Sequence, residues 1–171
     1  MRKKRARRRL AFWLALAALG APANSAAQDV MATSGDWQYG ADTELAATST
    51  RNPQGWLFGL VCSPDCIGFI EHDQPCEQGR RYESRMRTAR RDDPVSMECR
   101  PLNGRYALLF TPTEAFIDLL TSGPEVTVSV RLSGDADTDF RFSLNGAWDA
   151  VYVTLATAVA ATANPAGPGT I

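Results

Sequence analysis

An alternation of apolar and polar side chains in the second half of the chain limits the possible folds most. From Val126 to Leu132 every second residue is aliphatic, and the residues between them are Thr, Ser and Arg. Successive side chains of a strand point to opposite faces, so segment 125–132 is predicted to be a strand with one buried face. The same alternation returns from Phe140 to Leu144 after a Gly-Asp turn region. The two segments are therefore predicted to pair as an antiparallel hairpin.

Shorter apolar runs predict further strands earlier in the chain. The predicted segments are 43–50, 56–62, 66–71, 80–87, 95–100 and 105–110. The pair Asn103–Gly104 is the strongest hairpin-turn signal, and Trp37 with Tyr39 is expected to dock on the core as an edge. The pattern predicts a mostly β (α+β) fold. It would have roughly six to eight antiparallel strands, forming a sandwich or a partly closed barrel with one or two helices.

One helix has clear start and stop signals. Thr111 is predicted to cap it, Pro112 suits the first turn, and Glu114 completes a capping box. Gly123 and Pro124 supply the stop. This segment is predicted to be a short helix with one apolar face.

The final element is open to two interpretations. After Asn145 and Gly146, apolar residues at helical spacing predict an amphipathic helix, although Val151, Val153 and Leu155 also fit a strand. The residues predicted to share the apolar helix face are Trp148, Val151, Tyr152, Leu155 and Val159. The segment 164–171 is Pro, Gly and Ala without periodicity and is expected to be a disordered tail.

The start of the chain has the pattern of a secretory signal. Seven of the first nine residues are Lys or Arg, and a purely apolar run follows from Leu10 to Leu19. Small residues at Ser25 and Ala27 predict cleavage after Ala27, which leaves a single β-rich domain over 28–163. The apolar run is shorter than the roughly 20 residues that cross a bilayer, so the mature chain is expected to have no transmembrane anchor.

Four cysteines lie in the part of the chain predicted to be exported: Cys62, Cys66, Cys76 and Cys99. Disulfides persist in an oxidising compartment, and four cysteines allow three connectivities. We favour Cys62 with Cys66 and Cys76 with Cys99. A zinc site is the weaker alternative, because only Cys62 and Cys66 have the spacing of a ligand pair. We expect no metal and no cofactor.

Charge argues against one class of partner and suggests another. The chain has 18 basic and 19 acidic residues, so loss of the seven N-terminal bases leaves a net charge of about −8. Nucleic acid is then an unsuitable partner, because it requires a positive face. The stretch RRYESRMRTARR gathers guanidinium groups that suit an anionic envelope polymer. The anion-binding candidates are Arg80, Arg81, Arg85, Arg87, Arg90 and Arg91. In the alternative interpretation, nearby acids neutralise them on an exposed hairpin.

Reactive groups are sparse. His72 is the only histidine, and we expect it in a solvated loop rather than as a ligand or catalyst. Alternate aspartates at 135, 137 and 139 have the oxygen spacing of a calcium loop, but the later glycine and bidentate glutamate are missing. A small hydrolase would need two carboxylates in one cleft, with Glu71, Asp73 and Glu98 as the available acids.

Part of the chain resembles a known family. The segments TEAFIDLLTSG, EVTVSVRL and FRFSLNGAWDAVYVTL, within 111–155, resemble the C-terminal part of the invasion-associated locus B family of small bacterial periplasmic proteins. The resemblance implies a periplasmic β-rich domain with disulfides and an association with host-cell invasion. Before residue 100 the cysteine spacing and the arginine cluster depart from the family.

These observations predict a protein that is periplasmic or secreted. We expect a non-enzymatic binding or envelope-interaction module, with an anionic envelope polymer or another envelope protein as partner. The alternative is the small envelope hydrolase with paired carboxylates.

Overall fold

The computed structural model describes residues 32–41, 45–63, 65–102, 104–134 and 136–163. The predicted signal at 1–27 and the tail at 164–171 lie outside these ranges. The described elements are β1 (Ala32–Ser34), β2 (Trp37–Ala41), β3 (Ala46–Arg51), β4 (Leu57–Ser63), β5 (Asp65–His72), β6 (Arg81–Arg87), β7 (Asp92–Leu102), β8 (Arg105–Phe110), α1 (Glu114–Leu119), β9 (Glu125–Val130), β10 (Thr138–Ser143) and α2 (Ala147–Ala163).

The ten strands form one sheet in the order β1-β2-β3-β4-β5-β8-β7-β6-β9-β10. All of its strand pairs are antiparallel, and the sheet is not closed into a barrel because β1 and β10 remain its two edges. The mostly β antiparallel fold is thus confirmed. The prediction of six to eight strands was too low because it did not count β1 and β2. Strand β1 has only three residues, and Trp37 and Tyr39 of β2 were predicted only as an edge that docks on the core.

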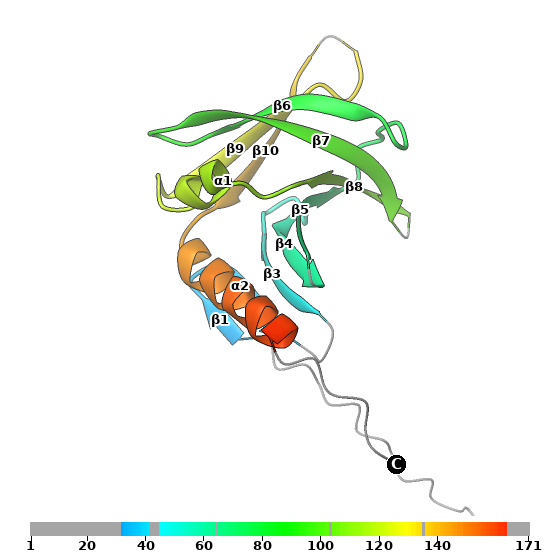
Figure 1. Cartoon of the computed structure of the whole chain (residues 1–171). Coiled ribbons are helices and arrows are strands. Elements are labelled where there is room, and N and C mark those ends of the chain that lie inside the picture. Colours follow the sequence, from blue (N-terminus) through cyan, green and yellow to red (C-terminus); the bar gives the residue numbers. More distant parts are fainter. Residues whose placement is uncertain (1–31, 42–44, 64, 103, 135, 164–171) are drawn as a thin grey trace, which may run out of the picture.

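The sheet bends over so that its two halves face each other across one core (Figure 1). The ring of Phe142 on β10 stacks on Phe58 of β4 with centroids 5.2 Å apart, and Phe140 approaches His72 of β5 at 5.0 Å. The hairpin of β9 and β10 has the predicted partners, including Phe142 with Val126. This aromatic cluster joins the two layers of the sandwich.

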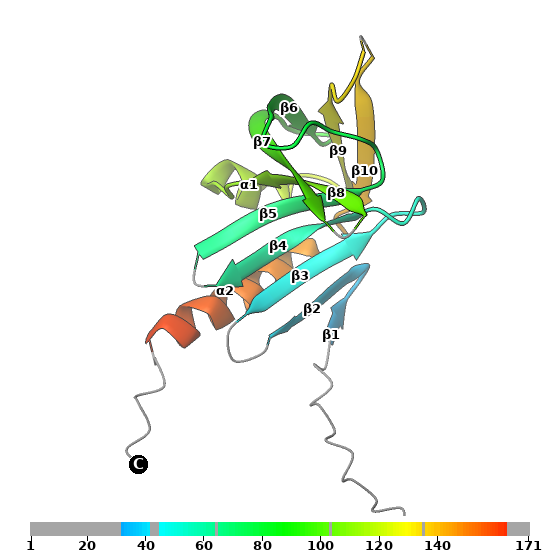
Figure 2. The ribbon, with the colours of Figure 1, turned by 90° about the vertical axis from the view of Figure 1, so that its right-hand side faces the viewer.

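Helix α2 covers the inner side of strands β2, β3 and β4 (Figure 2). The helical interpretation is confirmed, but the predicted apolar face is only partly right. Val151 is buried and Leu155 packs against the core, whereas the other three predicted residues are exposed. Trp148 and Tyr152 are 45% and 61% exposed, whereas Ala147, Ala150 and Val151 are buried. Small side chains let the helix approach the sheet closely, and they leave no room for the large aromatic residues on that side.

Helix α1 is shorter than predicted, and its capping residue was predicted wrongly. The N-cap is Thr113, whose hydroxyl accepts a hydrogen bond from the Phe116 amide at 3.3 Å. Thr111 is not the cap because β8 runs on to Phe110 and the following residues link the two elements. The helix ends at Leu119, ahead of the predicted stop at Gly123. Its apolar face is directed at the core as expected.

The described residues contain two disulfide bonds, and they have the pairing that we favoured from the sequence. Cys62 and Cys66 are register partners across the β4–β5 hairpin, with Cα atoms 4.0 Å apart. Cys76 and Cys99 join the loop after β5 to β7, with Cα atoms 6.1 Å apart. Among the described residues, no helix has the length and apolar character needed to span a bilayer.

Candidate functional site

Strand β7 changes partners along its length. It pairs with β6 from Asp92 to Glu98, but it pairs with β8 only from Glu98 to Leu102. The segment from Asp92 to Met97, called the open edge below, therefore has a strand on one side only. Figure 1 shows β7 extending over α1, beyond the end of β8.

The direction of the backbone groups on this edge follows from the pairing. In an antiparallel pair, consecutive residues direct their N–H and C=O groups to opposite sides. The Cys99 amide donates to the Arg80 carbonyl on the β6 side at 3.0 Å, so residues 93, 95 and 97 also face β6. Pro94 and Ser96 then face away from it. Proline has no N–H to donate, and it is tolerated at position 94 because no neighbouring strand lies on that side of β7.

A cleft of about 480 Å³ lies beside the open edge. Its floor is apolar and consists of Met86 and Met97 from the sheet with Phe116 and Leu119 from α1, all of them buried. Its rim is exposed and includes Pro94 and Ser96. The remaining lining residues are Ile67, Arg81, Asp93, Val95, Glu98, Arg100, Leu109, Phe110, Thr111, Thr113 and Ala115.

Three of the four charged residues that line the cleft, Asp93, Glu98 and Arg100, have an ion-pair partner. Asp93 accepts from Arg91 at 2.8 Å, and Glu98 meets Arg100 at 2.6 Å. The hydrogen bond from Arg91 holds the pKa of Asp93 below its usual value. Arg81 is the register partner of Glu98 on β6, and no ion pair involves it among the described residues.

Among the described residues, the three acids predicted for a hydrolase do not line one cleft. Of the three predicted acids, only Glu98 lines the cleft. Glu71 pairs with Arg105 at 2.8 Å, and Asp73 accepts from the Trp56 indole at 3.0 Å. The other acid in the cleft, Asp93, lies five residues from Glu98 along an extended strand, about 17 Å by strand geometry. That separation exceeds the roughly 5–9 Å of a glycosidase pair.

The six predicted anion-binding arginines do not converge on one point. The burial pattern of β6 places Arg81, Arg85 and Arg87 on its exposed face. Arg85 donates to Asp92 at 2.8 Å, and Arg87 donates to the hydroxyl of Ser129 at 2.6 Å.

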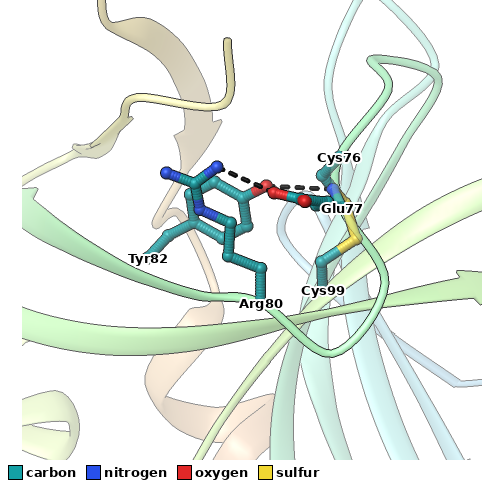
Figure 3. Close-up of a disulfide and its surroundings, with 5 residues drawn as sticks. All are labelled: Cys76, Glu77, Arg80, Tyr82 and Cys99. Carbon is teal, nitrogen blue, oxygen red and sulfur yellow. Dashed lines mark hydrogen bonds and ion pairs between the residues drawn. A yellow bond between two sulfur atoms is a disulfide. The ribbon is translucent and has the colours of Figure 1, made fainter.

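The remaining arginines of the cluster lie at the two ends of β6. Arg91 bridges Asp93 and Asp118, at 2.8 and 3.0 Å, and Arg90 lies beside it in the turn before β7. Arg80 donates to Glu77 at 2.8 Å and lies over the ring of Tyr82, next to the Cys76–Cys99 disulfide (Figure 3). Acidic partners thus neutralise much of the cluster.

His72 is buried in the core, so the expectation of a solvated loop was wrong. It ends β5 on the same face as Gly68 and Ile70, and its ring stacks on Tyr106 with centroids 6.2 Å apart. Neither ring nitrogen has a hydrogen-bond partner among the described residues. Burial lowers the pKa of His72 to about 4, against a smaller opposing effect of Asp73. The period-two pattern of β5 is the signal that could have placed it.

The aspartates considered for calcium have other partners. Asp137 accepts from Arg131 at 3.1 Å and Asp139 from Ser129 at 2.6 Å, while Asp135 lies outside the described residues. Within the described ranges, no three His, Cys, Asp or Glu residues are grouped so that they could hold a metal ion.

The fold and the cleft define a class: small, disulfide-linked, mostly β proteins with an open, bent sheet. No family model matches the chain, and no curated protein matches it. The solved structure of invasion associated protein B from Bartonella henselae is similar, with a TM-score of 0.57 and 10% sequence identity over 75% of this chain and 97% of that one. At this identity the likeness shows a shared fold. It confirms the resemblance noted from the residues between 111 and 155.

Proposed function

We propose that this protein is a non-catalytic binding module of the bacterial cell envelope, periplasmic or secreted, and that the cleft beside β7 is its ligand site. The observation that carries the proposal is the combination of a buried apolar floor with an exposed rim in a volume of about 480 Å³. Pockets of roughly 300–1,000 Å³ lined by apolar side chains are the usual form of a ligand site.

Three further findings support this assignment. The two disulfides suit an oxidising compartment outside the cytoplasm. The similar solved structure is that of an invasion associated protein, which fits an envelope role. The hydrogen bond from Arg91 lowers the pKa of Asp93 at the rim, and a carboxylate that stays ionised favours recognition over proton transfer.

Site-specific photo-crosslinking in living cells tests the proposal. A photoreactive phenylalanine analogue would replace Ile67, which lines the cleft and is 43% exposed. The control places the same group at Gln54, an exposed residue that does not line this cleft. We expect a discrete adduct from position 67 and none from position 54. Equal adducts at both positions, or none at either, would contradict a ligand site here.

A second candidate function is anion binding by the exposed face of β6. The observation that favours it is the placement of Arg81, Arg85 and Arg87 on one side of that strand. Reversing the charge of Arg85 and Arg87 should reduce retention on an anionic polysaccharide column without lowering the melting temperature. Unchanged retention at low salt would exclude this function.

A further inference from the structure

The open edge of β7 and the adjacent cleft form one continuous site. Ser96 directs its N–H and C=O away from β6, and Pro94 directs its C=O the same way. Both residues line the cleft and are exposed. Backbone polar groups at such an edge need partners, which water supplies until another chain does.

We propose that the ligand of the cleft is an extended peptide segment of another protein, which adds to the sheet as a strand beside the open edge. This inference rests on the proposed function, because it names the ligand class for the same cleft. Strand addition gains its affinity from main-chain hydrogen bonds and its specificity from pockets for alternate side chains. The open edge supplies the main-chain hydrogen-bonding groups, and the cleft supplies the pockets for side chains.

The floor of the cleft specifies the inward side chains of the peptide. In an extended segment, every second side chain would point toward Met86, Met97 and Phe116. Methionine side chains are flexible and polarisable, so they adapt to apolar groups of different shape. We therefore expect aliphatic or aromatic residues at these positions of the ligand.

The rim specifies the alternate, outward side chains. Arg81 is exposed and lines the cleft, while its register partner Glu98 is held by Arg100. The guanidinium of Arg81 is thus available to an incoming carboxylate, which would form a charge-assisted hydrogen bond. The expected ligand alternates apolar residues with at least one Asp or Glu.

A peptide selection tests this inference with a defined probe. Random linear twelve-residue peptides displayed on phage are selected against the disulfide-bonded protein, and the enriched sequence is synthesised with a fluorescent label. We expect enrichment of the alternating apolar and acidic pattern. Failure to enrich any peptide, while position 67 still gives its crosslinked adduct, would overturn strand addition and leave the cleft as a ligand site for another chemistry.

The decisive comparison uses two variants of one residue. Ser96→Pro removes the edge N–H and places a ring where the peptide would pair, while Ser96→Ala keeps the N–H. Both lose the hydroxyl contact of Ser96 with Glu83, so they are matched in that respect. We expect the Kd of the labelled peptide to stay within about twofold in Ser96→Ala and to rise at least about tenfold in Ser96→Pro. Equal affinities of the two variants would overturn main-chain pairing.

Charge reversal at the rim provides a second measurement. The Arg81→Glu variant is expected to weaken binding of the same peptide about fivefold to tenfold at low salt, and by less at high salt because salt screens exposed charges. Arg131→Glu, on an exposed residue outside the cleft, serves as the control. An equal loss of peptide affinity in Arg81→Glu and Arg131→Glu would contradict the assigned role of Arg81.

Discussion

The edge strand β10 and the open edge of β7 each have a side without a neighbouring strand, and the protein treats them differently. On β10, side chains cover the edge: Asn52 Nδ2 donates to the Arg141 carbonyl at 3.2 Å, and the Trp37 indole donates to the Ser143 carbonyl at 2.9 Å. On β7, the open edge faces a cleft with an apolar floor. Unprotected edges invite association, so natural proteins usually block them. The contrast indicates that the β10 edge serves stability, whereas the β7 edge is kept available for a partner.

The disulfide at the closed end of β7 gives the largest expected effect. Replacing Cys76 and Cys99 by Ser should lower the free energy of unfolding by about 3.5 kcal/mol, because the bridge closes a long loop in the unfolded chain. Replacing Cys62 and Cys66, only four positions apart, should cost about 2 kcal/mol. Urea denaturation of both variants measures the two values, and a larger loss for the short loop would contradict this ranking.

Acid should weaken the packing between β10 and β5. Because the pKa of His72 falls from 6.5 to about 4 on folding, the unfolded chain binds a proton that the folded protein excludes between these pH values. The stability that neutral His72 contributes is present above pH 6.5 and is lost as the pH falls toward 4. The free energy of unfolding should decrease by about 3 kcal/mol over this range. The variant His72→Phe should lack this part of the pH dependence. Parallel pH profiles of the two proteins in urea denaturation would show that His72 is not excluded from protonation.

Removing the Asn52 side chain that covers the β10 edge should lower the free energy of unfolding by a smaller amount. The Asn52→Ala change removes the donor to Arg141 and the acceptor for the Gln54 and Trp56 amides, for a loss of about 2 kcal/mol. Asn52→Asp keeps the acceptor oxygen but turns a charged oxygen toward the Arg141 carbonyl, so it should destabilise the protein through the contact with β10. Thermal unfolding checks both variants, and an unchanged melting temperature for Asn52→Ala would mean that this edge is not stabilised by the side chain.

The smallest effect is expected on the open edge itself. Ser96→Pro should change the free energy of unfolding by less than about 1 kcal/mol, because its N–H has no strand partner. Val95→Pro, one residue earlier, should cost about 3 kcal/mol or more, since that amide faces β6. Similar losses of unfolding free energy in the two variants would contradict the assignment of one side of β7 as paired and the other as open.

Local patterns in the sequence predicted the elements better than they predicted the cleft. The alternation from Val126 onward places β9 and β10 because each strand has one face in the core. The open edge depends instead on where β7 leaves β8, which is set by pairing between distant segments. Pro94, inside a strand, is the one local sign of it.

His72 and α2 show how packing overrides local appearance. The sequence predicts His72 in a solvated loop, yet the register of β5 directs it inward. On α2, the size of the residues decides which side meets the sheet, so Ala150 is buried and Tyr152 is not.

Amide hydrogen exchange along β7, followed by NMR on the disulfide-bonded protein, measures the openness of the edge directly. The amides of Val95 and Met97 should be protected because they face β6, whereas the amide of Ser96 between them should exchange quickly. Protection of Ser96 equal to that of its two neighbours would mean that the edge is already paired, and it would contradict the assignment of this edge to a partner.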